Sequence, residues 1–270
     1  MRINNNINAI NAMRNLSVSE AAQSKSLEKL SSGFRINRAA DDAAGLVISE
    51  GLRSQVGGLK VAMRNAQDGI SVVQTAEGAL TEVHSILQRM RDLTVQAANA
   101  GVNDATSIGA LQAEHNALTA ELDRIGGTTN FNGVKLVDGT FTAKVFQVGS
   151  NVGAADQITV TITGVGATAL AVNGLVVGAA ASQTAIDAAI TTVSASRGGL
   201  GALQNRFEHT INNLGVAVEN LTASESRIRD TDMAAEMSQL TKHQILTQAG
   251  TAMLAQANSS AQSVLTLLRG

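Results

Sequence analysis

The chain has 270 residues, a formal net charge of −2 and no Cys, Pro, Trp or Tyr. The lack of Cys excludes disulfides and thiolate zinc sites, and the interspersed, nearly balanced charge leaves no basic patch for nucleic acid. Apolar content is mostly small and aliphatic, which favours long helices with narrow seams over a thick globular core. No apolar run approaches the roughly 18 residues of a membrane span, and the N-terminus lacks the apolar core of a cleaved signal, so we expect no membrane insertion.

The first predicted helix begins near the N-terminus. Its apolar residues recur at steps of three and four, the spacing of one helix face. They are Ile3, Ile7, Ile10, Met13 and Leu16, followed after a gap by Leu27 and Leu30. The Ser-Ser-Gly at 31–33 is expected to end this helix, and residues 34–42 to form an irregular connector.

A much longer helix is expected over residues 46–98, where the same spacing continues. Its apolar face comprises Leu52, Val56, Leu59, Met63, Ile70, Val73, Leu80, Val83, Leu87, Met90 and Leu93. A further helix is expected over 108–125, with Gly126 and Gly127 as its stop. Because a short polar loop joins the two helices, they should pack as an antiparallel hairpin.

Between residues 128 and 178 the apolar residues alternate within Thr-rich runs, a pattern typical of strands. Asn-Gly at 132–133 and Asp-Gly at 138–139 are turn signals, so we expect a small β region of two hairpins. Such a region is too small to be stable alone and should pack on the helices.

The C-terminal part returns to helical spacing. Ser182 is expected to cap a third long helix that reaches residue 228, and a last helix covers 233–268. The predicted fold class is mainly α: long antiparallel helical bundle and coiled-coil rods from paired N- and C-terminal segments, with a β-hairpin region at the tip. Two thin terminal helices cannot bury their apolar stripes fully against each other, so we expect both ends to be disordered in the free chain and to fold in an assembly.

Long segments of this sequence resemble bacterial flagellin. They are MRINNNINAINAMRNL at the start, LSSGFRINRAADDAAGLVISEGLRSQ at 30–55, QDGISVVQTAEGALTEVHSILQRMRDLTVQAANAG at 67–101, NFNGVKLVDGTF at 130–141 and the C-terminal segment from Ser226. The resemblance covers 1–150 and 185–270. It implies three parts: a terminal coiled-coil domain (1–43 and 231–270) forming an inner tube, a helical rod domain with a β-hairpin (44–149 and 185–230) forming an outer tube, and a short variable region (150–184).

The resemblance implies a structural subunit, not an enzyme, that polymerises with itself into the helical flagellar filament for swimming motility and needs no cofactor. It also implies export in the unfolded state by the flagellar type III apparatus, and an extracellular location. The implied partners are other copies of the chain, a flagellar export chaperone, the filament cap, the hook-filament junction proteins, and host Toll-like and cytosolic flagellin receptors.

Two sets of residues match segments by which hosts recognise the family. The patch read by the flagellin-binding Toll-like receptor is matched by Gln88, Arg89, Leu93 and Glu114. The segment read by cytosolic flagellin sensors is matched by Val264, Leu265, Leu267 and Leu268. From the residues alone, ordinary bundle sequence with solvated arginines is the alternative for the first set.

Assembly contacts are expected on the apolar stripes at both ends and in the connector. The candidate residues are Ile3, Ile7, Ile10, Arg35, Arg38, Asp41, Asp42, Leu246, Met253, Val264, Leu265 and Leu268. The opposed connector charges favour salt bridges between subunits that act as a network, and a solvated loop is the alternative.

The sequence offers no catalytic or metal-binding constellation. The His residues at 84, 115, 209 and 243 are scattered and are expected at bundle edges, and no HExxH motif is present. Three other functions stay open. They are a junction or minor flagellin that does not grow filaments alone, a membrane-active translocator, for which the polar faces hold too little Lys and Arg, and, last, an enzyme.

Overall fold

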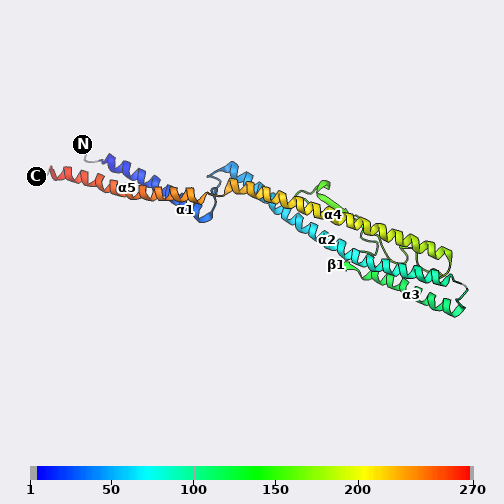
Figure 1. The fold of residues 1–270 in the computed structure, drawn as a ribbon. Helices are drawn as coiled ribbons and strands as arrows, with labels where there is room; N and C mark the ends of the chain where they lie inside the picture. Colours follow the sequence, from blue (N-terminus) through cyan, green and yellow to red (C-terminus); the bar gives the residue numbers. More distant parts are fainter. Residues whose placement is uncertain (1–4, 100, 268–270) are drawn as a thin grey trace. The chain divides into compact units, whose positions relative to one another are not determined.

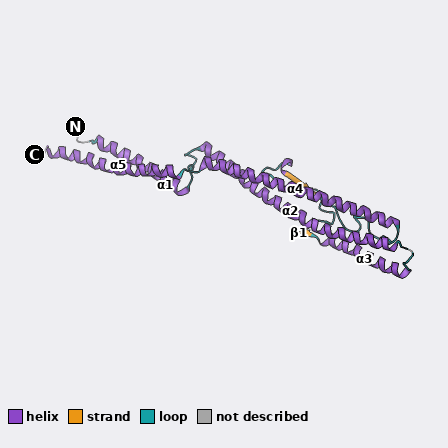
Figure 2. Cartoon of the chain, viewed as in Figure 1, coloured by secondary structure: helices purple, strands orange, loops and turns teal. Residues whose placement is uncertain are grey.

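The computed structural model describes residues 5–99 and 101–267, and the chain divides into two compact units. Unit 1 is built from 1–54 and 220–270, and unit 2 from 55–219. Helices dominate the described part of both units, and the short strands lie in unit 2 (Figures 1 and 2). The mainly α fold class predicted from the sequence is confirmed.

In unit 1, α1 (Ile7–Ser32) and α5 (Met233–Leu267) lie side by side (Figure 1). Asn6 donates through Nδ2 to the carbonyl of Ala257 at 2.9 Å near one end of the pair. Near the other end, Lys29 meets the Glu236 carboxylate at 3.4 Å, so the helices run antiparallel. These contacts confirm the predicted pairing of the two ends of the chain.

The ends of α1 follow from local sequence. The Asn6 side chain accepts a hydrogen bond from the N–H of Ala9 and caps the first turn. Gly33 ends the helix in the left-handed conformation (φ 75°), which glycine adopts without strain, and its N–H donates to the carbonyl of Lys29. The connector then runs to Asp42, which accepts from the N–H of Gly45 at 2.9 Å. The predicted helix end and irregular connector are confirmed.

Unit 2 is a bundle to which α2 (Ala43–Ala97), α3 (Ala105–Thr128) and α4 (Ala180–Arg229) contribute. Residues of α2 and α4 belong to both units. Leu52, Leu59 and Met63 of the apolar face predicted for the long helix are half-buried, and the later members of that face from Val73 to Met90 belong to the core of this bundle. Its fully buried large side chains include Leu80, Leu87, Met90, Leu93, Leu122, Ile186, Leu200 and Phe207.

The predicted end of α3 at Gly126 and Gly127 is wrong. The helix continues through both glycines to Thr128, and the N–H of Thr129 still donates to the carbonyl of Ile125 at 3.1 Å. A Cβ on Gly126 would lie 3.4 Å from the backbone nitrogen of residue 166, so this glycine permits a close backbone approach. Its role depends on a tertiary contact that helix-end rules do not include.

The predicted N-cap role of Ser182 is also wrong. α4 begins at Ala180, and Ser182 lies buried in its first turn. The Ser182 hydroxyl donates to the carbonyl of Val176 at 2.7 Å and so joins the helix to the segment before it.

A tight hairpin follows α3. Strands β1 (Asn130–Phe131) and β2 (Val134–Lys135) are antiparallel. Both turn residues have positive φ, 50° at Asn132 and 79° at Gly133, as expected for an Asn-Gly two-residue turn. This predicted hairpin is confirmed.

A second antiparallel pair joins β3 (Lys144–Gln147) to β4 (Gln157–Val160), with a short 3₁₀ helix (Ala154–Asp156) between them. The chain then continues without strands to α4, yet much of it is buried. Its buried apolar residues are Ile162, Val165, Ala167, Leu170, Val172 and Val177. Most of them join the cluster of α2 and α4 side chains, so this segment forms part of the unit 2 core.

Candidate assembly surfaces

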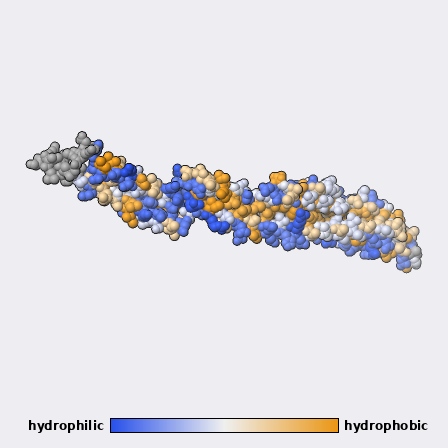
Figure 3. Space-filling model, turned by 90° about the horizontal axis from the view of Figure 1, so that it is seen from above, coloured by the Kyte–Doolittle hydropathy of each residue, from blue (hydrophilic) through white to orange (hydrophobic). Residues whose placement is uncertain are grey.

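The helix pair of unit 1 buries little of its own apolar surface. Within its described side chains, α1 buries only Ser26, and Leu240 is the buried apolar residue of α5. The large apolar residues that stay exposed are Ile7, Ile10, Met13, Val18, Leu27, Met233, Met237, Ile245, Leu246 and Met253. Apolar residues reach the surface beside the chain ends (Figure 3). We call this set the terminal apolar face.

Four residues predicted as assembly contacts belong to the terminal apolar face. They are Ile7, Ile10, Leu246 and Met253, whose exposed fractions are 58%, 60%, 43% and 63%. Ile3 and Leu268 lie outside the described residues. Val264, Leu265 and Leu267 belong to α5, but their side chains lie outside those described.

The predicted connector charges all find partners within the chain. Arg38 meets Glu28 at 2.8 Å, and Asp41 meets Lys25 at 2.8 Å. Arg35 donates to a backbone carbonyl of α4, and Asp42 caps α2. Their predicted role between subunits is untested by these intrachain contacts.

The ionised form of the Asp41 carboxyl is stabilised by the groups that surround it. The Lys25 ammonium that bonds it, together with the backbone N–H of Arg38 and then that of Asn37, lowers the pKa of Asp41 from 3.8 to about 2. This carboxylate therefore stays ionised well into the acid range and holds the connector against α1.

The two connecting segments of unit 1 are joined by a cluster that we call the connector clasp: Phe34, Arg35, Glu50, Arg229 and Asp230. Phe34 and Asp230 form an isolated antiparallel β-bridge, and the N–H of Arg35 donates to the carbonyl of Arg229 at 2.6 Å. The Arg229 guanidinium lies 4.6 Å from the centroid of the Phe34 ring and 2.8 Å from a Glu50 carboxylate oxygen. Of these residues, the sequence interpretation singled out Arg35 alone.

The predicted receptor patch is partly assembled on the surface of unit 2. Arg89 of α2 meets Glu114 of α3 at 2.8 Å, which raises the pKa of Arg89, and both side chains are exposed. Gln88 lies on the same surface, with its amide 2.9 Å from Nε2 of His84. Leu93 is fully buried in the bundle, so it does not form part of this surface.

His115 is buried in α3 rather than placed at a bundle edge, which corrects the sequence expectation. Neither ring nitrogen has a hydrogen-bond partner, and burial lowers the pKa of this imidazole below 6.5. Within 5–99 and 101–267, no three His, Asp or Glu side chains gather as metal ligands. In the same residues, no helix combines the length and apolarity needed to cross a membrane.

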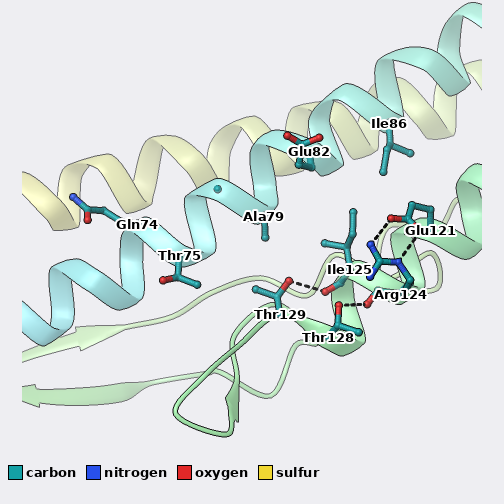
Figure 4. A pocket seen from close by; sticks show the side chains of 11 residues that line it. Gln74, Thr75, Ala79, Glu82, Ile86, Glu121, Arg124, Ile125, Thr128 and Thr129 are labelled. Atoms are coloured by element: carbon teal, nitrogen blue, oxygen red, sulfur yellow. Dashed lines mark hydrogen bonds and ion pairs between the residues drawn. The ribbon is translucent and has the colours of Figure 1, made fainter.

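A groove in unit 2 lies between α2 and the C-terminal end of α3 (Figure 4). Glu121 holds Arg124 through two hydrogen bonds of 2.8 and 2.6 Å, and the Thr128 hydroxyl donates to the carbonyl of Arg124. Gln74 and Glu82 line the opposite wall. These are the features of a solvated helix surface, since the hydrogen bonds join neighbouring residues of α3 to one another.

Known flagellins are similar to this chain over its whole length. Residues 3–142 match the model of the bacterial flagellin N-terminal helical region, and 183–268 match that of the C-terminal helical region. A flagellin of Bacillus subtilis is 52% identical over the whole of both chains, and flagellin FlaB1 of Treponema pallidum is 44% identical over the same extent. The crystal structure of Bacillus cereus flagellin is 33% identical, with 56% of this chain and 88% of that chain covered and a TM-score of 0.48. The chain belongs to the bacterial flagellin family and has the structural role in the flagellum that the family implies.

Proposed function

We propose that this chain polymerises with itself into the flagellar filament and that the terminal apolar face is the surface buried between copies. Residues 1–43 and 231–270 form the inner tube in this proposal, residues 44–149 and 185–230 the outer tube, and 150–184 a short variable region. The subunit passes unfolded through the type III apparatus and acts outside the cell. An export chaperone, the filament cap and the hook-filament junction proteins are its partners in assembly.

One observation carries this proposal. Ten large apolar side chains of α1 and α5 are exposed, while each helix buries almost none of its described side chains. Large apolar side chains exposed in this number on one helix pair are costly in water and mark an interaction site. Because the face runs along both helices of a pair, other copies of the same pair are the matching occupants.

Electron microscopy of the purified protein after addition of short filament seeds tests the proposal. Wild-type protein should extend the seeds, and Ile10→Asp should not, because a carboxylate cannot be buried in an apolar contact without a large penalty. Val152→Asp is the matched control, since Val152 is 94% exposed in a loop of unit 2. Failure of the wild type to grow would favour a junction protein, and liposome leakage without filaments a translocator.

We also propose that the free subunit is recognised by host receptors. The exposed Arg89, Glu114 and Gln88 supply a charged surface that spans α2 and α3, which supports recognition by the flagellin-binding Toll-like receptor. The segment from Val264 to Leu268 is the proposed site for cytosolic flagellin sensors. Assembly would cover both sites, so the monomer is the form that receptors bind.

Receptor activation by variants tests the first of these sites. Arg89→Ala should lower activation at equal monomer concentration and leave polymerisation intact. Arg124→Ala is the control, because its pair with Glu121 is also exposed but lies within α3. Equal activation by Arg89→Ala and the wild type would remove the site from the proposal.

A further inference from the structure

The described methionines divide sharply between the two units. Those of unit 1 are exposed: Met13 by 66%, Met253 by 63%, Met237 by 51% and Met233 by 49%. Those of unit 2 are Met63, which is half-buried, and Met90, which is fully buried. Since the oxidation of a thioether follows its exposure, the sulfurs at risk gather on α1 and α5.

The exposed methionines share the terminal apolar face with its aliphatic residues. Met233 and Met237 are four residues apart and lie on one side of α5. In the antiparallel pair a Cβ on Gly250 would touch Leu16 at 3.2 Å, a register that brings Met13 and Met253 to the same level. The four sulfurs therefore lie in two groups along one helix pair.

We propose that Met13, Met233, Met237 and Met253 are oxidation sites of the free subunit and that their conversion to sulfoxides by a peroxide blocks its assembly. The inference rests on the proposed polymerisation. In each step the sulfur lone pair attacks one oxygen of hydrogen peroxide, the O–O bond breaks, and the departing hydroxide takes the proton from the newly bound oxygen to form water. The sulfur loses two electrons, the peroxide gains them, and no further reactant is needed.

The consequence follows from the polarity of the product. A sulfoxide oxygen is a hydrogen-bond acceptor, and burial against aliphatic side chains offers it no donor. Assembly removes water from the terminal apolar face, and the sulfoxide groups make the loss of that water unfavourable. The change is reversible, because methionine sulfoxide reductases remove the added oxygen.

The test uses the full chain, hydrogen peroxide and the seeded polymerisation assay. Peroxide treatment of the monomer should raise the critical concentration for growth at least about tenfold. Peptide mass mapping should show the four unit 1 methionines oxidised first and Met90 spared. In preformed filaments the same four should be oxidised more slowly than in the monomer.

Two variants and a repair step separate the possible outcomes. A variant with Leu at all four unit 1 positions, which nearly conserves side-chain volume, should polymerise equally well before and after peroxide. Met63→Leu should stay as sensitive as the wild type. Reductase treatment of oxidised wild type should restore growth, which keeps the test valid if the quadruple variant folds poorly.

Persistent inhibition after complete repair would overturn the inference, as would oxidised wild type that grows normally. Untreated wild type that forms no filaments would instead overturn the proposed function, and this inference with it.

Discussion

Gly69 and Gly78 both lie inside α2, but the structure predicts opposite effects when each is changed to Ala. An Ala Cβ at position 78 would meet nothing within 4 Å. Ala in a helix interior is favoured over Gly by about 1 kcal/mol, so Gly78→Ala should raise the free energy of unfolding by about that amount.

At Gly69 the same methyl group would lie 2.7 and 2.9 Å from two ring atoms of Phe207. That ring is fully buried and packs edge-on against Phe146, with centroids 5.7 Å apart and planes at 81°, so it has little room to move. Overpacking of a core costs about 1–3 kcal/mol, which cancels or exceeds the gain in helix propensity.

The two variants should therefore differ by about 1–3 kcal/mol, with Gly78→Ala the more stable. Urea unfolding of the monomer, followed by circular dichroism, measures the difference through the transition midpoints at equal slope. If Gly69→Ala stabilises the chain as much as Gly78→Ala, the result would contradict the close packing of the Phe207 ring against Gly69 of α2.

Further predictions concern titration and packing. The unpartnered His115 has a pKa below 6.5, so the unfolded chain binds its proton more readily and stability should fall as pH drops below 6.5, by at most about 1.4 kcal/mol per pH unit. His115→Leu should lack that part of the pH dependence in urea unfolding at pH 7.5 and 5. The carboxyl of Asp41 should titrate by NMR near 2 and move toward 3.8 in Lys25→Met, and an unchanged value would contradict their ion pair. Phe207→Ala should lower the free energy of unfolding by about 3–5 kcal/mol, measured by urea.

The helices were readable from sequence because their signal is local. Apolar residues that recur at steps of three and four mark the buried face of a helix, and α2 keeps this spacing along its length. Gly33 and the Asn132-Gly133 turn were readable for a similar reason, since their positive φ depends on residue type at a few neighbouring positions.

Features that depend on distant contacts were missed. Gly126 resembles a helix stop until Gly166 is placed against it, and Ser182 resembles a cap until its bond to Val176 is known. The connector clasp joins residues that lie 179 or more positions apart in sequence, and no local pattern marks Arg229 as the partner of Phe34.

Burial of individual polar groups was equally hard to predict. The sequence places His115 on a helix with apolar neighbours. Periodicity shows on which side of the helix the imidazole lies, but it does not show how deeply the side chain is buried. The candidate assembly residues were easier to find, because an apolar stripe can be read whether or not anything in the same chain covers it. The surface that covers this stripe belongs to other copies of the chain, so the periodicity of one copy does not identify it.

The central claim is that the terminal apolar face is buried only when copies assemble. Amide hydrogen exchange of α1 and α5, measured on dilute monomer and again after seeded growth, tests it most directly. We predict rapid exchange along both helices in the monomer and strong protection in the filament, because the isolated pair buries too little surface to offset its ordering. Strong protection of both helices already in dilute monomer would contradict the account.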